Sequence, residues 1–369
     1  MARLSSDLTE NVEGGFAPPP YPYARLSRLS EVADSLDGGV VDLSIGTPCD
    51  PAPAAVVEAM ASSGSEHGYP SSAGGQALRE AAARWIERRF AARVDPKNVA
   101  ACVGTKELVA STASYLRLRD PSRDVVIAPG VAYPTYAIGA QLAGCEVMCL
   151  PESPDGGVDL SHVPREVARR SVMVWLNSPS NPTGSLSDLG RAASWGREHG
   201  VPVFSDECYV EFTWDPHEPS TILQARDGRG DGADLHGGVV AVHSLSKRSN
   251  MAGMRVGFYA GDADLVGYLS AVRQHAGLMV PGPVQAAAVA ALDDDAHVAV
   301  QRDRYRRRLE RLAEILAGAG LDPRMPSGGF YLWVPVPPWA EREARRPAGP
   351  EEGPTASWVL AEVLAKTAG

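Results

Sequence analysis

The feature that most constrains the fold of this chain is a regular alternation of short apolar runs with longer amphipathic segments. Short Gly/Pro turns join the two kinds of segment, and the amphipathic pattern is strongest over residues 76–90. Strands that alternate with helices in this way favour a mostly parallel sheet covered by helices, an α/β fold. The apolar runs predict strands at residues 40–45, 99–103, 124–128, 147–150, 171–176, 201–205, 239–243 and 256–260.

Polar residues follow several of the predicted strands directly or nearly so. Ligand sites in such sheets lie at the carboxyl ends of the strands. One crevice can therefore collect the residues found at these positions, which are Gly104, Thr105, Asn181, Asp206 and Lys247. This convergence is the main structural argument for a functional site.

The two ends of the chain differ from its central part. Residues 14–23 are too rich in proline for regular helix or central strand, and a short helix is expected over residues 24–36. From residue 267 onward the pattern is mainly helical. There we predict helices at residues 286–292, 296–317 and 355–366, a strand at residues 328–334 in a smaller α+β domain, and a loop at residues 335–354.

These patterns divide the chain into three parts. We predict an N-terminal arm that belongs partly to the small domain (1–40), a large domain (41–270) and a small C-terminal domain (271–369). A chain of 369 residues is long enough for two such domains.

Composition excludes several classes of function. The net charge of -10 argues against a nucleic-acid partner, because a phosphate backbone requires a basic face. No run of apolar residues is long enough to predict a membrane span. The five cysteines form an odd set without metal-ligand spacing, so we expect no zinc site and a reducing, cytoplasmic location.

The most informative motif surrounds Lys247. Ser244 and Ser246 precede this lysine just after an apolar run, and Arg255 follows it. The hydroxyls and the guanidinium suit a phosphate, and a nearby cation lowers the pKa of an amine that must form a Schiff base. An isolated motif of this kind is more often a strand-to-helix turn with exposed basic residues.

A second group of residues suits the same ligand. The segment Gly104-Thr105-Lys106 follows a strand and opens a helix, where free backbone N–H groups bind anions. Asp206 ends a buried strand, where a carboxylate requires a cation such as a protonated ring nitrogen. Read alone, the first segment is a common turn, and Asp206 is a helix-capping residue.

Three further residues suit a planar ring that carries an oxygen. Asn181 lies in a rigid polar loop and can hydrogen-bond a polar ring substituent, and Tyr209 can hydrogen-bond a phenolate oxygen. Tyr133 offers an aromatic face for stacking. The alternatives are a β-turn for Asn181 and a core position for Tyr209. Taken together, the lysine, the anion site, the aspartate and these residues form the environment that pyridoxal 5'-phosphate requires.

From residue 40 to residue 333 the chain resembles the class I/II aminotransferases, which are pyridoxal-phosphate enzymes of fold type I. The resemblance implies a large domain with a mostly parallel, seven-stranded type of sheet between helices, and a smaller α+β domain. It implies that Lys247 forms the Schiff base and moves a proton between the substrate α-carbon and C4′ of the cofactor. It also implies that Asp206 binds the ring nitrogen, and that Tyr209 and Asn181 hydrogen-bond the ring oxygen.

The resemblance assigns the remaining site residues as well. Tyr133 corresponds to the stacking aromatic residue, and Gly46 to the glycine near the substrate carboxylate. Tyr69 corresponds to the tyrosine that reaches the phosphate of a neighbouring subunit, which implies a homodimer with shared sites. The phosphate site implied by the resemblance consists of Gly104, Thr105, Ser244, Ser246 and Arg255.

Within this group, the chain is most similar to the N-succinyldiaminopimelate aminotransferases of actinobacterial type. The matching runs are LSIGTP (43–48), GTKELV (104–109), SDECY (205–209), HSLSKRSN (243–250) and HAGLMVP (275–281). The implied reaction moves an amino group between glutamate and N-succinyl-2-amino-6-ketopimelate, in lysine and diaminopimelate biosynthesis.

One departure from the group concerns the substrate carboxylate. The group carries an arginine for this carboxylate on a C-terminal strand, and this chain ends at Gly369, about where that strand would begin. We therefore expect a truncated small domain, an intact cofactor site and weak carboxylate binding. Two alternatives stay open, which are another aminotransferase or a lyase on the same fold, and a non-catalytic relative that binds the cofactor without turnover.

Overall fold

The computed structural model describes residues 25–153, 156–225, 236–345 and 355–368. The chain forms two compact units, of which one comprises Met1–Ile45 with Pro335–Gly369 and the other comprises Gly46–Val334. The predicted division into an arm, a large domain and a small domain, at residues 40 and 270, stays a prediction.

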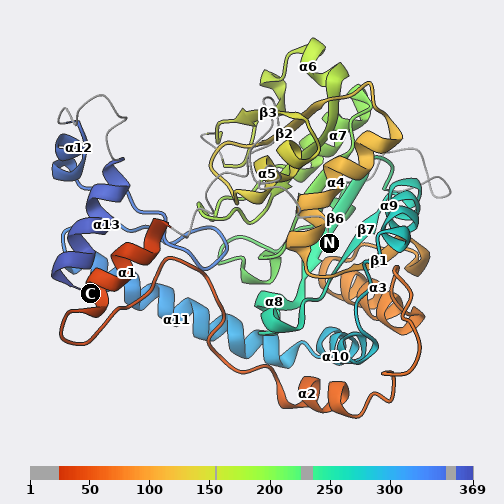
Figure 1. Cartoon of the computed structure of the whole chain (residues 1–369), viewed down its shortest axis with the longest axis horizontal. Coiled ribbons are helices and arrows are strands. Elements are labelled where there is room, and N and C mark those ends of the chain that lie inside the picture. The colour runs from red at the N-terminus through yellow and green to blue at the C-terminus, as the bar shows by residue number, and fades with distance from the viewer. Residues whose placement is uncertain (1–24, 154–155, 226–235, 346–354, 369) are drawn as a thin grey trace, which may run out of the picture. The chain divides into compact units, whose positions relative to one another are not determined.

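A seven-stranded sheet forms the centre of the unit Gly46–Val334 (Figure 1). The strand order is β1-β7-β6-β5-β4-β2-β3. Strand β7 runs antiparallel to β1 and β6, and the other neighbours are parallel, which confirms the predicted mostly parallel sheet. The strands are β1 (Val99–Cys102), β2 (Val125–Pro129), β3 (Glu146–Leu150), β4 (Ser171–Asn177), β5 (Val203–Asp206), β6 (Val239–Ser244) and β7 (Gly257–Gly261).

Helices cover both faces of this sheet, and the sequence of β6 shows why. Val239 and Ala241 belong to one hydrophobic cluster, whereas Val240 and Val242 belong to the other. Successive side chains of a strand point to opposite faces, so a sheet that is buried on both sides requires a continuous apolar run.

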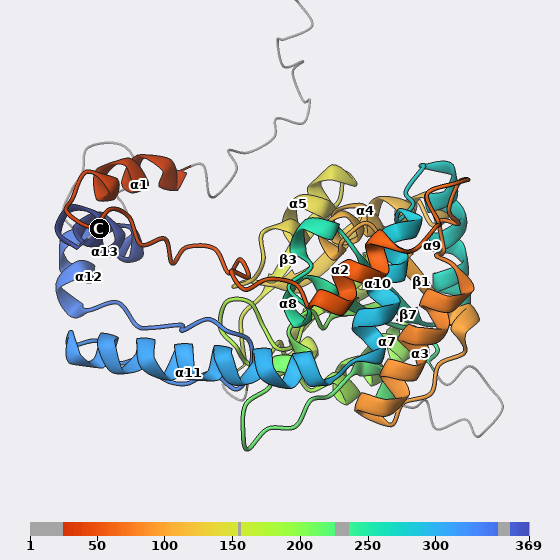
Figure 2. The ribbon, with the colours of Figure 1, turned by 90° about the horizontal axis from the view of Figure 1, so that it is seen from below.

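The two clusters contain residues from different sets of helices. The first cluster includes residues of α2 (Ala54–Ala61), α3 (Gln76–Phe90), α7 (Leu189–His199) and α10 (Gly282–Asp293). The second includes residues of α4 (Thr105–Arg119), α5 (Thr135–Leu142) and α9 (Ala263–His275). Helices α2 and α10 lie side by side (Figure 2). The short α6 (Arg165–Arg170), α8 (Leu245–Arg248) and the long α11 (Ala296–Gly318) complete the helices of this unit. Within the described residues, no helix is long and apolar enough to cross a membrane.

Local capping fixes several helix ends. The side chain of Asp188 accepts a hydrogen bond from Arg191 N at the start of α7, and Gly200 ends that helix with a φ of 63°. Asp262 accepts one from Leu265 N at the start of α9. Aspartate at the first position and glycine at the last satisfy the backbone groups that a helix leaves unpaired.

The unit that contains both chain ends is helical in its described part. Helix α13 (Ala356–Thr367) packs against α1 (Ser27–Asp34) and against α12 (Pro338–Ala344). The predicted loop at residues 335–354 is therefore wrong for α12. Pro338 occupies the first turn of that helix, where proline loses no hydrogen bond, so it begins the helix rather than breaking it.

Two predicted strands are also wrong. Residues 40–45 form no strand, and Val41 and Leu43 are 65% and 69% exposed, so their alternating pattern packs against no sheet. Residues 328–334 form only an isolated bridge between Gly328 and Thr213. Gly329 has a φ of 74°, which interrupts extended backbone at the point where the apolar pattern predicts a strand.

A buried ion pair connects α4 to α9. Both terminal nitrogens of Arg273, a fully buried residue, donate to the two carboxylate oxygens of Glu107, at 2.5 and 2.9 Å. By contrast, the ion pair between Arg119 and Asp264 is exposed, with 40% and 71% of the two side chains accessible.

Replacing Arg273 by methionine should lower the free energy of unfolding by about 3 kcal/mol, because Glu107 would keep a partly buried charge without its cation. The matched replacement Arg119→Met removes an exposed pair and should cost less than about 1 kcal/mol. Urea unfolding of both variants measures the difference. Equal losses in the two variants would contradict this account of the Arg273–Glu107 pair.

Candidate active site

Three parallel strands bring polar residues to one edge of the sheet. Strands β4, β5 and β6 end at Asn177, Asp206 and Ser244, and α8, which carries Lys247, begins directly after β6. The pairing of Asn177 with Asp206 in the β4–β5 register places these two ends side by side. The convergence expected from the sequence is thus a consequence of the strand order and register.

The amine of Lys247 lies in a sheltered position. Its Nζ donates a hydrogen bond to the carbonyl of Gly46 and lies 5.7 Å from the centre of the Phe330 ring. Burial lowers the pKa of Lys247, and the positive charge of Arg255 lowers it further, while Cys208 opposes both. A lysine in such surroundings loses its proton more readily than an exposed lysine and is a better nucleophile.

Gly46 is required at this position by packing. A Cβ atom there would overlap the hydroxyl of Tyr331 and the ring of Phe330. The backbone of Gly46 can approach Lys247 only because it carries no side chain.

Asp206 is a buried carboxylate at the end of β5. Its Oδ2 accepts a hydrogen bond from the hydroxyl of Tyr136 at 2.8 Å, and its Oδ1 accepts one from Cys208 N at 3.1 Å. Burial raises the pKa of Asp206, and the two hydrogen bonds oppose that increase. A carboxylate of this kind is ready to pair with a buried cation, such as a protonated ring nitrogen.

A chain of hydrogen bonds connects Asn181, Tyr209 and Tyr331. The amide Nδ2 of Asn181 donates to the hydroxyl of Tyr209 at 3.4 Å, and the hydroxyls of Tyr209 and Tyr331 lie 3.1 Å apart. The loop position of Asn181 is held by its backbone N–H, which donates to Asn177 Oδ1 at 2.6 Å. These three polar groups are directed at one region beside Lys247 and Gly46.

A separate group of residues is the candidate site for an anion, which we call the anion cradle: Gly104, Thr105, Ser244, Ser246 and Arg255. Gly104 precedes α4 with a φ of 72°, and a Cβ atom there would overlap the guanidinium of Arg255. Thr105 begins α4, and its hydroxyl accepts a hydrogen bond from the thiol of Cys208 at 3.3 Å. Ser244 caps α8 by accepting a hydrogen bond from Ser246 N at 3.1 Å.

The remaining predicted residues lie around these groups. The ring of Tyr133 lies 5.8 Å from Nζ of Lys106 and packs edge-on against Tyr136, with 6.0 Å between the ring centres. Tyr69 lies on the loop before α3 and is 99% exposed.

The groups fit pyridoxal phosphate. The guanidinium of Arg255 lies against the bare backbone of Gly104, so a cation and the first N–H groups of α4 would face a phosphate together, and the serine hydroxyls at the start of α8 would be further donors. The buried carboxylate of Asp206 suits the ring nitrogen, and the amine of Lys247 suits the aldehyde. These residues would hold the cofactor in that orientation.

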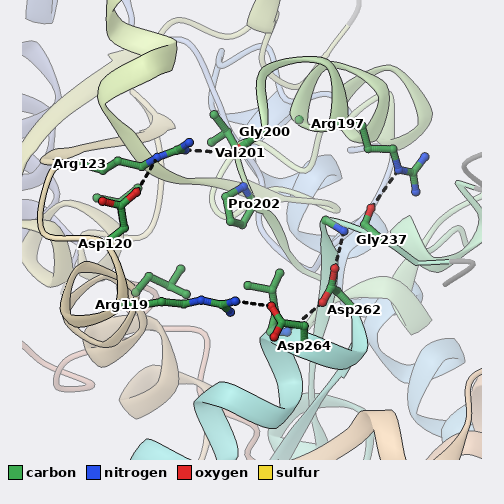
Figure 3. A pocket seen from close by; sticks show the side chains of 15 residues that line it. Arg119, Asp120, Arg123, Arg197, Gly200, Val201, Pro202, Gly237, Asp262 and Asp264 are labelled. Carbon is green, nitrogen blue, oxygen red and sulfur yellow. Dashed lines mark hydrogen bonds and ion pairs between the residues drawn. The ribbon is translucent and has the colours of Figure 1, made fainter.

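A cavity of about 610 Å³ lies elsewhere, at the opposite ends of the strands (Figure 3). It is lined by Val172 and Pro202, near the starts of β4 and β5, and by the start of α9. Its charged groups already have partners. The contacts are Arg119 to Asp264 at 2.5 Å, Arg123 to Asp120 at 3.2 Å, Arg197 Nε to the Gly237 carbonyl at 3.0 Å, and Gly238 N to Asp262 Oδ2 at 2.7 Å. This cavity therefore differs from the site around Lys247 in both position and chemistry.

The chain belongs to the class I and II aminotransferase family, whose model matches residues 38–349. It is 43% identical over 320 residues to a probable aminotransferase of Mycobacterium tuberculosis, covering 86% of this chain and 72% of that relative. It is also 43% identical to the 4-dedimethylamino-4-oxo-anhydrotetracycline transaminase OxyQ of Streptomyces rimosus, covering 86% of this chain and 84% of the relative.

A solved structure supports the same assignment. The probable N-succinyldiaminopimelate aminotransferase of Thermus thermophilus superposes with a TM-score of 0.75 at 28% identity, covering 93% of this chain and 99% of that one. The predicted fold, fold type I, is thereby confirmed, as is the predicted class of enzyme, a transaminase that depends on pyridoxal 5'-phosphate.

Sequence reasoning missed two residues that complete this site. Tyr136 holds Asp206 through its hydroxyl. Tyr331, whose hydroxyl contacts that of Tyr209, lies in a segment whose apolar pattern predicts a strand of the small domain. Tyr136 lies three residues after Tyr133 and packs edge-on against its ring, so this aromatic neighbour is the sequence signal that could have found it.

A neutral buried pair lies behind the site. Glu207 follows Asp206, and its Oε2 is 3.4 Å from Nε2 of His243. Burial raises the pKa of Glu207 to about 8 and lowers the pKa of His243 to about 3. Near neutral pH both side chains are therefore uncharged, and His243 packs edge-on against the ring of Trp85.

Replacing Gly104 by alanine should weaken the binding of pyridoxal phosphate at least tenfold. The alanine would suffer backbone strain of about 1–3 kcal/mol and would displace the guanidinium of Arg255. Gly253→Ala is the matched control, because a Cβ atom at Gly253 meets nothing within 4 Å. Cofactor titration followed by absorbance measures both dissociation constants, and an unchanged constant for Gly104→Ala would refute the anion cradle.

Replacing Glu207 by glutamine should change how stability depends on pH. The pKa of Glu207 is about 8 in the folded chain against 4.5 for a free side chain, so the folded state binds more protons between these values, and wild-type stability falls as pH rises through this window. The glutamine variant lacks this loss. The difference in unfolding free energy between the variant and the wild type should therefore increase, in favour of the variant, by more than about 1 kcal/mol from pH 5 to pH 8. Glu218→Gln, at an exposed position, should show no such gain, and a parallel pH profile for the Glu207 variant would contradict the assignment.

Proposed function

We propose that this aminotransferase moves the amino group of glutamate to a keto acid, with N-succinyl-2-amino-6-ketopimelate as the acceptor. The observation that carries the proposal is the position of the Lys247 amine. Its pKa is lowered, its Nζ donates to the carbonyl of Gly46, and it lies just after β6, at the carboxyl ends of the strands where Asp206 also lies.

The roles of the residues follow from their contacts. Bound pyridoxal phosphate supplies an aldehyde that condenses with amines and a ring that accepts electrons from the substrate α-carbon. Lys247 Nζ, once unprotonated, would take the proton from that carbon and would return it to the cofactor at C4′. Asp206, held by Tyr136, keeps the proton on the ring nitrogen.

Other residues hold and orient the reactants. The anion cradle, with Lys106 beside it, fixes the phosphate, and Tyr133 covers one face of the ring. Tyr209 and Asn181 donate to the ring oxygen. Gly46 and Asn181 lie on the side where the substrate carboxylate binds. Each of these roles is part of the proposal and is supported by the distances given above.

The proposal includes a homodimer in the cytoplasm. Tyr69 is almost fully exposed in the single chain, as expected if its hydroxyl reaches the phosphate site of a second subunit. The five cysteines are all free, which suits a reducing compartment.

The choice of acceptor is supported by the Thermus thermophilus neighbour, whose name specifies N-succinyldiaminopimelate and which aligns with almost its whole length. The Streptomyces rimosus relative acts, by its name, on a tetracycline ketone. Its 43% identity favours a polycyclic ketone as a second candidate acceptor. A coupled assay with both acceptors, started from the glutamate-treated enzyme, separates the two candidates.

Adding glutamate to the protein loaded with pyridoxal phosphate should bleach the visible absorbance band of the bound cofactor. The band should be absent or shifted in Lys247→Ala, and glutamate should not bleach it at a measurable rate, because both the amine link and the proton carrier are lost. Lys97→Ala is the matched control, since Lys97 is exposed, and it should behave as the wild type does. A wild-type band that glutamate leaves unchanged would exclude transamination with this donor.

A further inference from the structure

Tyr331 makes a contact at the site that the roles proposed above leave unexplained. Its hydroxyl lies 3.1 Å from the hydroxyl of Tyr209, and the two rings are 5.8 Å apart at an angle of 70°. Phe330 packs against both rings, with ring centres 5.3 Å from Tyr209 and 5.0 Å from Tyr331. This packing fixes the direction in which the two hydroxyls face each other.

The direction of this hydrogen bond follows from counting protons. A phenol has one proton to donate and can accept two hydrogen bonds. If Tyr209 donates its proton to the ring oxygen of the cofactor, as the proposed function requires, it can only accept across the 3.1 Å contact. Tyr331 is then the donor, and Asn181 Nδ2, at 3.4 Å, is the second donor.

We propose that Tyr331 is a positioning residue that donates its phenolic proton to Tyr209 and so strengthens the hydrogen bond from Tyr209 to the cofactor. This inference rests on the proposed function. Hydrogen bonds in a chain polarise one another, and the effect is larger where water is excluded. Tyr209 is buried, so its hydroxyl depends on these few partners.

The surroundings keep Tyr209 in the required state. Burial raises the pKa of Tyr209 well above the usual value, so the phenol keeps its proton and remains a donor. The titratable groups that act on it are Tyr331, Cys208 and Asp206. Lys247, on α8, would be engaged by the cofactor.

The inference has a spectroscopic consequence. A strong hydrogen bond at the ring oxygen withdraws electron density from the conjugated ring, so the nitrogen that joins Lys247 to the cofactor releases its proton at lower pH. Weakening that bond should raise the pKa at which the visible band of the bound cofactor changes. The relevant measurement is therefore a pH titration of absorbance, with no substrate present.

Tyr331→Phe removes the hydroxyl and keeps the ring. The pKa of the visible band should rise by about half a unit, a shift that corresponds to part of one neutral hydrogen bond. Tyr305→Phe is the matched control: its ring packs on the same Phe330, at 4.8 Å, but its hydroxyl donates to Asn250, so its pKa should stay at the wild-type value. In a Tyr209→Phe background, Tyr331→Phe should add no further shift, because the residue that transmits the effect is gone.

A second variant keeps the inference testable if Tyr331→Phe does not fold. Site-specific 3-fluorotyrosine at position 331 preserves the shape of the side chain and makes the hydroxyl a stronger donor, so the pKa should fall. An unchanged pKa in Tyr331→Phe and in the fluorinated protein would overturn the inference, as would a shift of equal size without Tyr209. The absence of any visible band in the wild type would instead contradict the proposed function itself.

Discussion

The site depends on one buried carboxylate. Asp206 lies at the end of β5 with almost no access to water, and its charge is stabilised by the thiol and backbone N–H of Cys208 and by the hydroxyl of Tyr136. Burial of this charge without a cation is unfavourable, as the raised pKa of Asp206 shows. In the proposed function, the cationic ring nitrogen of the bound cofactor would balance this charge. The position of the carboxylate is fixed in turn by the parallel pairing of β5 with β4 and β6.

The anion cradle depends on the absence of a side chain at Gly104. Gly104 leaves space that the guanidinium of Arg255 fills, so a cation and the start of α4 face the same volume. Arg255 itself has a positive φ of 55° and donates to the carbonyl of Ala252 at 2.9 Å, which anchors its side chain. An arginine held in this way is ready to bind a phosphate with little loss of side-chain freedom. Two backbone positions with positive φ, Gly104 and Arg255, are therefore concentrated at the candidate anion cradle.

Much of the fold was predictable because it follows from local patterns. The seven strands of the sheet, helix α3 and the long α11 appear as apolar runs and amphipathic periods, and the residues at strand ends are visible by their position. The two wrong strand predictions have one cause. Residues 40–45 and 328–334 have strand-like patterns, yet a strand exists only where a neighbour pairs with it, and the sequence of one segment does not specify its neighbours. The contact of Tyr331 with Tyr209 spans 122 residues and was unpredictable for the same reason.

The same reasoning explains why the role of Lys247 was easier to infer from the sequence than the groups that determine its reactivity. A lysine after a buried strand is recognisable, but its reactivity depends on groups brought from Gly46, Cys208, Arg255 and Phe330. Burial and Arg255 both favour the unprotonated amine, and no carboxylate is among the groups that shift its pKa. An aspartate or glutamate beside this amine would hold its proton and delay attack on an aldehyde. Asp206, at the end of β5, is held instead by Tyr136, and Glu207, which follows it, lies beside His243 and is uncharged near neutral pH.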